Sequence, residues 1–319
     1  MTVTGRGDVG YAKARKTNFT PVVRLLAVKS EHDVDFLEAA INNHKTIVES
    51  TGVPQLTAPQ LSNYNIYFPL IEEEKKIGAF FKQLDDTIAL HQRKLTLLKQ
   101  LKQTSLHLII PQNEENSPTL RFDGFTMKWD QRKLGDVTTK IGSGKTPKGG
   151  NSVYTQSGVP LLRSQNIYND RVNFEDTVYI TESTDNEMAN SRVEKNDVLL
   201  NITGASIGRT AVYEMSSHSN VNQHVCIIRP IYEIDSYFIQ LNLTSLNGQK
   251  QIELNQAGGG REGLNFQQIG KIVFSYPSSG EQKKIGDFFK RLDKTTSLHQ
   301  SKLEKLLELK NVLLGKMFR

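Results

Sequence analysis

The chain has 319 residues, 37% of them hydrophobic, with a formal net charge of +6 and a pI of about 9.1. This length suffices for two domains, and no stretch approaches the roughly 20 apolar residues of a membrane-spanning helix. Residues 1–15 lack the apolar core of a secretory signal, and the one cysteine, Cys226, excludes an internal disulfide and a thiol-based metal site. We therefore expect a cytoplasmic protein with an anionic partner, of which nucleic acid is the commonest kind.

Residues 1–71 come first in the chain, and they match a stretch that lies much later. Residues 3–10 (VTGRGDVG) parallel residues 202–208 (ITGASIG). Four later positions, Gly52, Leu56, Gln60 and Pro69, match residues 208 positions further on. Residues 129–198 have no counterpart in this first copy. The sequence therefore predicts the C-terminal part of a β-rich domain, cut off at its start.

Two long helices are predicted, over residues 72–110 and 281–319, and they contain the strongest repeat. Residues 75–95 (KKIGAFFKQLDDTIALHQRKL) and 283–303 (KKIGDFFKRLDKTTSLHQSKL) are identical at 15 of 21 positions, without a gap. Such a distant repeat indicates two copies of one large unit. At 1.5 Å per residue, helices of about 36 residues would span roughly 54 Å, which suits a spacer.

Apolar and histidine side chains in both helices recur at alternating steps of four and three, the spacing of a coiled-coil seam. The residues predicted to pack helix against helix are Leu84, Ile88, His91, Leu95, Leu98, Leu292, His299, Leu303 and Leu306. Because His91 and His299 are equivalent in the repeat, we expect them to pack, against each other, rather than to do chemistry.

The first helix should end before Pro111, since proline cannot continue a helix. Residues 111–128 are polar and rich in turn formers, which indicates a linker. A second β-rich domain is then predicted over residues 129–280. Within it we expect strands at 193–202, 209–213, 221–229 and 271–274 and a helix at 235–255.

Polar loops of this domain carry side chains suited to DNA. Lysine suits phosphates, arginine can pair bidentately with guanine, and Gln or Asn with adenine. The predicted DNA-binding residues are Lys145, Thr146, Lys148, Arg163, Ser164, Gln165, Asn166, Arg209, Arg261 and Asn265. The alternative for each loop is structural: a glycine turn with solvated charges, or a strand end with local hydrogen bonds. A P-loop is excluded because Thr139 stands where its first glycine would be.

Catalytic patterns do not emerge from the sequence. No nucleophilic triad, metal-ligand spacing or N-P-P-[YF] methyltransferase motif occurs, and Asn222-Gln223-His224 lies in a strand-like pattern that predicts structural residues. We therefore expect a chain that is not an enzyme and that relies on partners for any catalysis.

An ordered set of motifs covers nearly the whole chain. A proline-led turn precedes E-Q-x-x-I-G at residues 281–286, with E-E-x-x-I-G at 73–78 in the first copy. The others are Trp129 with L-G-D at 134–136, G-S-G-K-T-P at 142–147, G-V-P-L-L-R at 158–163, T-G-A-S-I-G at 203–208, N-Q at 222–223 and L-N at 264–265. This order resembles the specificity (S) subunit of type I restriction–modification systems.

The resemblance implies an α+β fold in which β-rich target recognition domains are joined by two long helices that form an antiparallel coiled-coil spacer. In that family each recognition domain reads half of a split DNA target, and the helices dock the methyltransferase (M) subunits. The implied partners are double-stranded DNA, M subunits and a restriction (R) subunit, with no membrane. The resemblance implies no cofactor in this chain, and S-adenosylmethionine, ATP and Mg only in the partner subunits.

Two questions stay open at the level of sequence. The incomplete first domain fits a truncated or rearranged gene product, and equally a chain completed by a second S chain. The rival function is a coiled-coil interaction scaffold that does not itself bind DNA.

Overall fold

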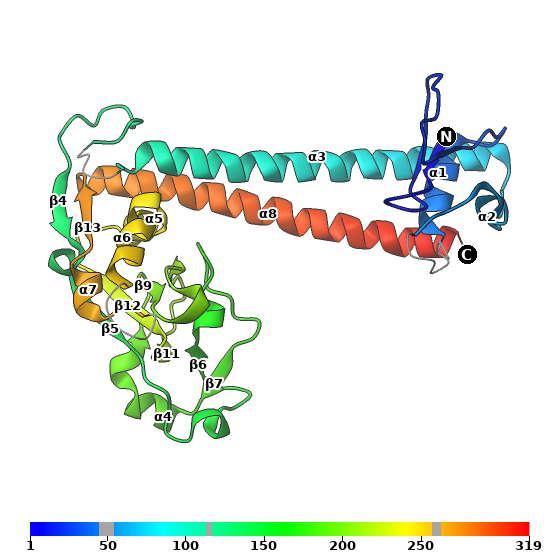
Figure 1. Cartoon of the computed structure of the whole chain (residues 1–319). Helices are drawn as coiled ribbons and strands as arrows, with labels where there is room; N and C mark the ends of the chain where they lie inside the picture. The colour runs from blue at the N-terminus through cyan, green and yellow to red at the C-terminus, as the bar shows by residue number, and fades with distance from the viewer. Residues whose placement is uncertain (45–53, 113–116, 257–262, 319) are drawn as a thin grey trace. The chain divides into compact units, whose positions relative to one another are not determined.

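The structure, a computed structural model, describes residues 1–44, 54–112, 117–256 and 263–318. The chain divides into two compact units (Figure 1). The first unit comprises residues 1–97 and 296–319, and the second comprises residues 98–295. Both long helices contribute one segment to each unit.

Among its described residues, the second unit contains two four-stranded sheets and one strand pair. The first sheet has the order β10-β9-β12-β5 and is antiparallel; its strands are β5 (Thr138–Ser143), β9 (Val198–Asn201), β10 (Thr210–Val212) and β12 (Val225–Pro230). The second has the order β7-β6-β11-β8; its strands are β6 (Val159–Leu162), β7 (Val178–Ile180), β8 (Arg192–Val193) and β11 (Ser219–Val221). Strand β4 (Asp130–Lys133) pairs with β13 (Val273–Tyr276).

Short helices complete this unit. The α-helices are α4 (Glu182–Glu187), α5 (Ser236–Thr244), α6 (Leu246–Gln256) and α7 (Phe266–Gly270). The 3-10 turns are η1 (Leu134–Val137), η2 (Gly150–Val153), η3 (Ser164–Asn166), η4 (Ala189–Ser191) and η5 (Gly204–Ser206).

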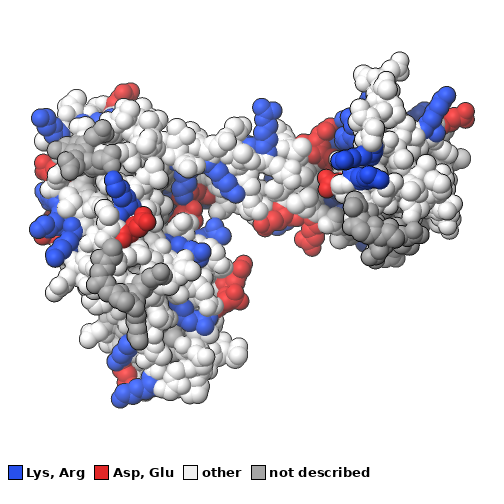
Figure 2. Space-filling model, in the orientation of Figure 1, with Lys and Arg blue, Asp and Glu red and all other residues white. Residues whose placement is uncertain are grey.

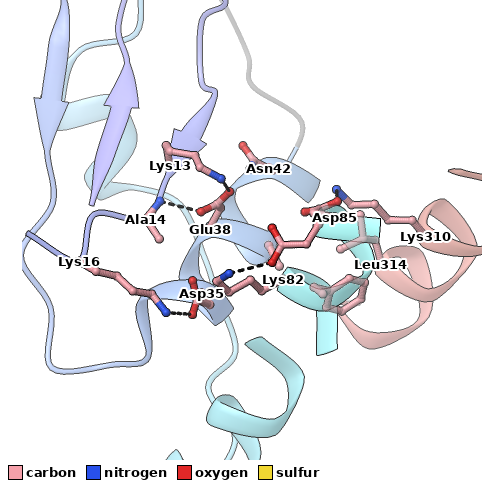
Figure 3. A pocket seen from close by; sticks show the side chains of 13 residues that line it. Lys13, Ala14, Lys16, Asp35, Glu38, Asn42, Lys82, Asp85, Lys310 and Leu314 are labelled. Atoms are coloured by element: carbon pink, nitrogen blue, oxygen red, sulfur yellow. Dashed lines mark hydrogen bonds and ion pairs between the residues drawn. The ribbon is translucent and has the colours of Figure 1, made fainter. Parts of the chain in front are cut away.

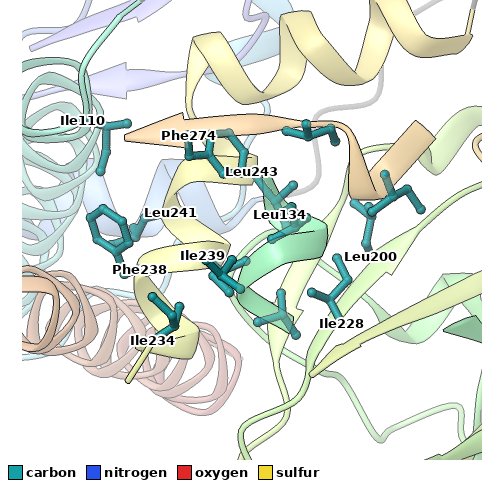
Figure 4. Packing of buried hydrophobic residues seen from close by; sticks show 14 of the residues in the cluster. Ile110, Leu134, Leu200, Ile228, Ile234, Phe238, Ile239, Leu241, Leu243 and Phe274 are labelled. Carbon is teal, nitrogen blue, oxygen red and sulfur yellow. The ribbon is translucent and has the colours of Figure 1, made fainter. Parts of the chain in front are cut away.

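The first sheet of this unit is buried on both faces. Leu200 and Ile228 point into a core with Phe238 of α5 and Phe274 of β13 (Figure 4). The residues that precede them in the strands, Leu199 and Ile227, belong to a separate core on the other face. Because successive strand residues point to opposite faces, burial of both faces explains the apolar run of residues 198–200 in β9.

Two predicted strands are each divided in the structure, and the predicted helical stretch is confirmed but interrupted at one residue. The expected strand 193–202 divides into β8 and β9, which lie in different sheets, at a turn where Asn196 has φ 72°. Residues 222–224 similarly separate β11 from β12. The expected helix 235–255 divides at Ser245, and Gly248 approaches α5 so closely that a Cβ there would overlap the Asn242 carbonyl oxygen.

The first unit repeats part of this fold in a smaller form. Its sheet has the order β2-β1-β3, with β1 (Thr2–Thr4), β2 (Ala12–Lys13) and β3 (Leu25–Ala27). The helices α1 (Val34–Asn43) and α2 (Ala58–Ser62) follow it, as α5 and α7 follow the larger sheet. Capping boxes begin α2 and α7, and their first residues, Thr57 and Asn265, stand 208 positions apart.

The two predicted long helices are confirmed as α3 (Ile71–Ile109) and α8 (Ser279–Met317), each of 39 residues. In the first unit, Asp85 pairs with Lys310 at 2.5 Å, and His91 Nδ1 lies 3.0 Å from His299 Nδ1. Later residues of α3 thus face earlier residues of α8, so the segments are antiparallel there. In the second unit, Lys102 pairs with Asp293 at 2.5 Å.

The E-Q-x-x-I-G motif holds a short helix against each long one. Gln282 Oε1 accepts a hydrogen bond from the backbone N–H of Asp235, the N-cap of α5, at 3.1 Å. Glu74 Oε2 accepts the equivalent bond from Asp33, the N-cap of α1, at 3.1 Å. The motif glycine permits close approach, since a Cβ on Gly286 would lie 2.7 Å from Asp235 Oδ1. This motif is therefore explained by packing.

Candidate nucleic-acid interface

Four strands of the second unit end in polar loops that contact one another. The loops follow β5, β6, β9 and β11 and comprise residues 144–148, 163–166, 203–209 and 222–224. We call them the interface loops. Most of the residues predicted to bind DNA lie in them.

The loops after β5 and β11 are joined directly. The Thr146 hydroxyl donates a hydrogen bond to Gln223 Oε1. At Gly144 a Cβ would overlap the Val221 carbonyl oxygen, so only glycine permits this approach. The glycine-rich sequence here serves backbone packing, and it presents Lys145 and Lys148 on either side of Thr146.

Asn201, at the end of β9, joins two further loops. Its side chain is fully buried, and Nδ2 donates to the Ser164 carbonyl at 2.8 Å and to Ser206 Oγ at 3.1 Å. The loops after β9 and β11 are joined by Thr203 Oγ1 and His224 Nδ1, which lie 2.6 Å apart. All four loops therefore form one connected surface.

Residues 263–265 extend this surface. The backbone N–H of Leu264 donates to the Ile202 carbonyl at 3.0 Å, and Thr203 forms a bridge with Gly263. Asn265 is exposed, but its Oδ1 accepts from the Gln268 N–H at 2.9 Å as the cap of α7. Arg261, which was predicted to contact DNA, lies outside the described residues.

Four predicted DNA contacts are exposed in the interface loops: Thr146, Lys148, Gln165 and Arg209. Of these, Thr146 is bonded to the loop after β11. Lys145 is also exposed, but its Nζ donates to the Glu187 carbonyl at 2.9 Å. Ser164 is half-buried, and its carbonyl is the acceptor for Asn201.

Asn166 requires a correction, because only 1% of the residue is exposed. Its Oδ1 accepts from the Arg163 N–H at 2.9 Å, while Nδ2 donates to the Asn173 carbonyl at 3.0 Å and to Thr177 Oγ1 at 3.3 Å. The amide is thus used to hold the turn and is not available to a base. Sequence alone does not distinguish a turn-holding asparagine from a base-reading one.

Arg163 is half-buried and partly engaged by the protein. Its Nη2 donates to the Asp176 carbonyl at 2.9 Å, and its Nε is buried without a hydrogen-bond partner. Its predicted role in base reading stays a prediction.

The sequence interpretation missed Gln223 and His224 as members of this surface, and it missed Asn201 as the buried side chain that joins two of its loops. The signal was Asn222, which closes a turn by accepting the His224 N–H at 3.1 Å. Asparagine favours such turns because its side chain mimics a backbone acceptor. An apolar run interrupted by N-Q-H is therefore better interpreted as two strands and a turn.

Several basic side chains of this unit serve structure. Arg229 donates to both carboxylate oxygens of Asp197 at 2.8 Å. Burial opposes ionisation of Asp185, but hydrogen bonds from Arg192, Asn220 and His218 outweigh it and lower the pKa of Asp185. Figure 2 shows Lys and Arg side chains dispersed over the face in view, with acidic ones between them.

The described part of the chain contains no cluster of side chains suited to hold a metal ion: no three His, Cys, Asp or Glu side chains are grouped there. Burial raises the pKa of the Cys226 thiol to about 12, so this thiol is protonated at neutral pH. None of the described helices is both long and apolar enough to cross a membrane.

A charged pocket of about 300 Å³ lies in the first unit (Figure 3). Its lysines face acids: Lys13 pairs with Glu38 at 2.7 Å, and Lys16 pairs with Asp35 at 2.8 Å. The Asp85–Lys310 pair closes the side formed by α3 and α8. This pocket is best explained as a set of ion pairs that join β2 and its following loop to α1, and α3 to α8.

A family model for the type I restriction modification DNA specificity domain matches residues 1–100 and 127–308. The chain is 26% identical over 169 residues to the type I restriction enzyme EcoBI specificity subunit of Escherichia coli, covering 51% of this chain and 35% of that protein. It is 20% identical over 279 residues to the MjaVIII specificity subunit of Methanocaldococcus jannaschii, covering 85% and 65%. The chain spans less than two thirds of the length of these curated relatives.

The fold is similar to that of a solved structure. The crystal structure of a type I restriction–modification S subunit from M. genitalium matches all of this chain and 82% of its own length, with a TM-score of 0.71 and 18% identity. At this identity the likeness concerns the fold alone.

Proposed function

The chain belongs to the family of type I restriction modification DNA specificity domains, and from this premise we propose that it binds DNA sequence-specifically and directs methyltransferase and restriction subunits to a split target. The observation that carries the proposal is the convergence of the four interface loops. Sequence readout requires donors and acceptors that a rigid scaffold presents to the grooves. Buried Asn201 and Asn166 provide that rigidity here.

Gln165 is the side chain best placed to read a base. It is exposed, while the residues on both sides of it are anchored by Asn201 and by the buried amide of Asn166. A glutamine amide can both donate to and accept from adenine in the major groove. We assign Gln165 to base recognition.

Arg209 is the side chain best placed to contact a phosphate. Its carbonyl accepts from the Asn201 N–H at 2.9 Å, and its N–H donates to the Ser206 carbonyl at 3.1 Å. The backbone is thus fixed while the guanidinium is exposed. Phosphate contacts of this kind set register and dominate affinity.

The remaining assignments complete the proposal. The long helices act as spacer and docking face for M subunits, which is supported by Leu90 and Leu298, equivalent in the repeat and 65% and 63% exposed. The chain itself is non-catalytic and holds no cofactor, while S-adenosylmethionine, ATP and Mg act in the partner subunits. The complex works in the cytoplasm, and a second S chain completes the first unit.

The test compares three variants in complex with the M subunits, on the duplex that the unaltered complex selects. We expect Gln165→Ala to weaken specific binding by about 1–3 kcal/mol and to relax one target position. Arg209→Ala should weaken binding to target and non-target duplexes alike. It should also reduce by about one the slope of the logarithm of the binding constant against the logarithm of the salt concentration. Lys133→Ala is the control, because this exposed lysine lies in β4, outside the four interface loops.

Wild-type specificity and salt dependence in both loop variants would contradict this assignment. The rival scaffold hypothesis predicts that no variant changes binding, because the chain would not touch DNA.

A further inference from the structure

Within the second unit, Lys102 of α3 joins the two long helices to the hairpin that follows the interface loop after β6. Its Nζ lies 3.0 Å from Asp170 Oδ2 in the hairpin and 2.5 Å from Asp293 Oδ1 in α8. The three side chains are 21%, 29% and 26% exposed. Burial raises the pKa of the Asp293 carboxyl, and the charge of Lys102 opposes this rise. The lysine therefore neutralises two carboxylates that are partly removed from water.

The hairpin is hydrogen-bonded to the interface loop that precedes it. At its base the Asn173 N–H donates to the Asn166 carbonyl at 2.8 Å, and the Asn166 side chain donates to the Asn173 carbonyl at 3.0 Å. At its tip the Tyr168 N–H donates to the Arg171 carbonyl at 3.0 Å. A displacement of Asp170, which lies in this tip, is therefore transmitted to the loop through paired backbone.

The tip has a backbone conformation that needs support. Asp170 has φ 88°, a region that residues other than glycine seldom adopt and that persists where the surroundings hold it. Its N–H donates to the carbonyl of Thr210, the residue after Arg209, at 3.1 Å, and its carboxylate is bound by Lys102. Arg171 approaches the same carboxylate only to 3.9 Å and is 63% exposed. The tip is thus held from two sides, by β10 and by α3.

We propose that Lys102 is a positioning residue for DNA specificity: it holds the hairpin, and through it the loop that carries Gln165, in place among the interface loops. The inference rests on the proposed function and assigns part of the specificity to a side chain of a spacer helix. Groups that read bases must be held within about 0.5 Å of their productive positions. The Lys102 ammonium is itself not free for a phosphate, because it lies between two carboxylates.

Loss of the lysine charge would leave two carboxylates facing each other. The negative charge of Asp170 already raises the pKa of Asp293, so the two groups interact. Like charges at close range repel each other. Asp293 lies within the 39-residue helix α8, whereas Asp170 lies in a turn, so the turn is the part that yields. We therefore expect Lys102→Met to displace the hairpin tip and the loop attached to it.

The test measures discrimination by the complex with M subunits, in competition between the duplex that the unaltered complex selects and duplexes with one base pair changed. Lys102→Met should lower discrimination at one or more positions by about fivefold or more, the loss expected when one base contact is misplaced. Lys102→Arg keeps the charge between the two carboxylates and should restore discrimination to within about twofold. Lys99→Met, which removes an exposed lysine three residues earlier in α3, is the matched control and should change nothing.

A second variant keeps the test decisive where Lys102→Met does not fold. Asp170→Gly removes the bound carboxylate, leaves Lys102 paired with Asp293, and places in the tip the residue that adopts a positive φ most readily. It should relax the same target positions as Lys102→Met. Because both substitutions break one contact, the double variant should discriminate no less than Lys102→Met alone.

Specific results would overturn the inference. Unchanged discrimination in Lys102→Met or in Asp170→Gly would do so, as would a loss that Lys102→Arg does not restore. Preserved discrimination with a salt slope of the binding constant reduced by about one would show instead that Lys102 contacts a phosphate. In each of these cases the proposed function would stand. If the unaltered complex does not discriminate between duplexes, the proposed function fails and the inference fails with it.

Discussion

A glycine-to-alanine change in α3 tests how closely α1 packs on this helix. The test is whether the change raises or lowers the free energy of unfolding. In the middle of a helix, alanine usually stabilises over glycine by about 0.5–1 kcal/mol. At Gly78, however, a Cβ would lie 2.6 Å from the backbone nitrogen of Phe36 and against the carboxylate of Asp33, the N-cap of α1. Forced overpacking costs about 1–3 kcal/mol, and loss of a cap about 0.5–2 kcal/mol. We therefore expect Gly78→Ala to destabilise the protein by about 2 kcal/mol.

Gly315→Ala is the matched control, because it makes the same change in the other long helix, where the new Cβ would meet no atom within 4 Å apart from its chain neighbours and the nearby backbone of its own helix. We expect it to stabilise by about 0.5 kcal/mol, since it lies in the last turn. Both free energies of unfolding are measured by urea denaturation, followed by the helical circular dichroism signal. If Gly78→Ala is as stable as Gly315→Ala, the proposed seating of α1 is refuted.

Two further predictions concern the helix pair in the first unit. Leu95→Ala should lower the free energy of unfolding by about 2–3 kcal/mol, because Leu95 is 8% exposed within the shared apolar cluster. Leu90→Ala, at a 65% exposed position, should change the free energy of unfolding by less than about 0.5 kcal/mol. Similar losses in the Leu95 and Leu90 variants would contradict the packing of Leu95 between the two helices. Desolvation and the positive charges of Lys94, His91 and Lys302 lower the pKa of His299 below its ordinary value of 6.5. The unfolded chain therefore binds a proton at this histidine more readily than the folded chain, and the melting temperature should fall as the pH drops below 6.5. In His299→Gln the melting temperature should depend less on pH. An unchanged dependence in the variant would contradict the role of His299.

The long helices were predictable because their signal is local and repeated. Leucine and histidine spacing indicates a helix over many turns, and the two copies support each other, so both helices are found within two residues of their expected first residues. The correspondence between the two units was likewise visible from the 208-residue shift.

The sheet connections were not predictable from local pattern. An apolar run that crosses from one sheet to another looks like one long strand, and only tertiary packing shows that the chain turns at Asn196 or at residues 222–224. The same limit applies to single side chains. Asn166 and Gln165 are neighbours with similar amides, yet one is buried and holds the turn while the other is exposed.

The central claim is that the interface loops give a methyltransferase complex its DNA sequence specificity. The most direct measurement is to co-express the chain with the M subunits, purify the complex, and map methylated positions on DNA from the same cells. We predict that methylation recurs at one defined sequence, and that Gln165→Ala broadens it at one position. Methylation without a recurring sequence, or an unchanged target in the variant, would contradict the claim.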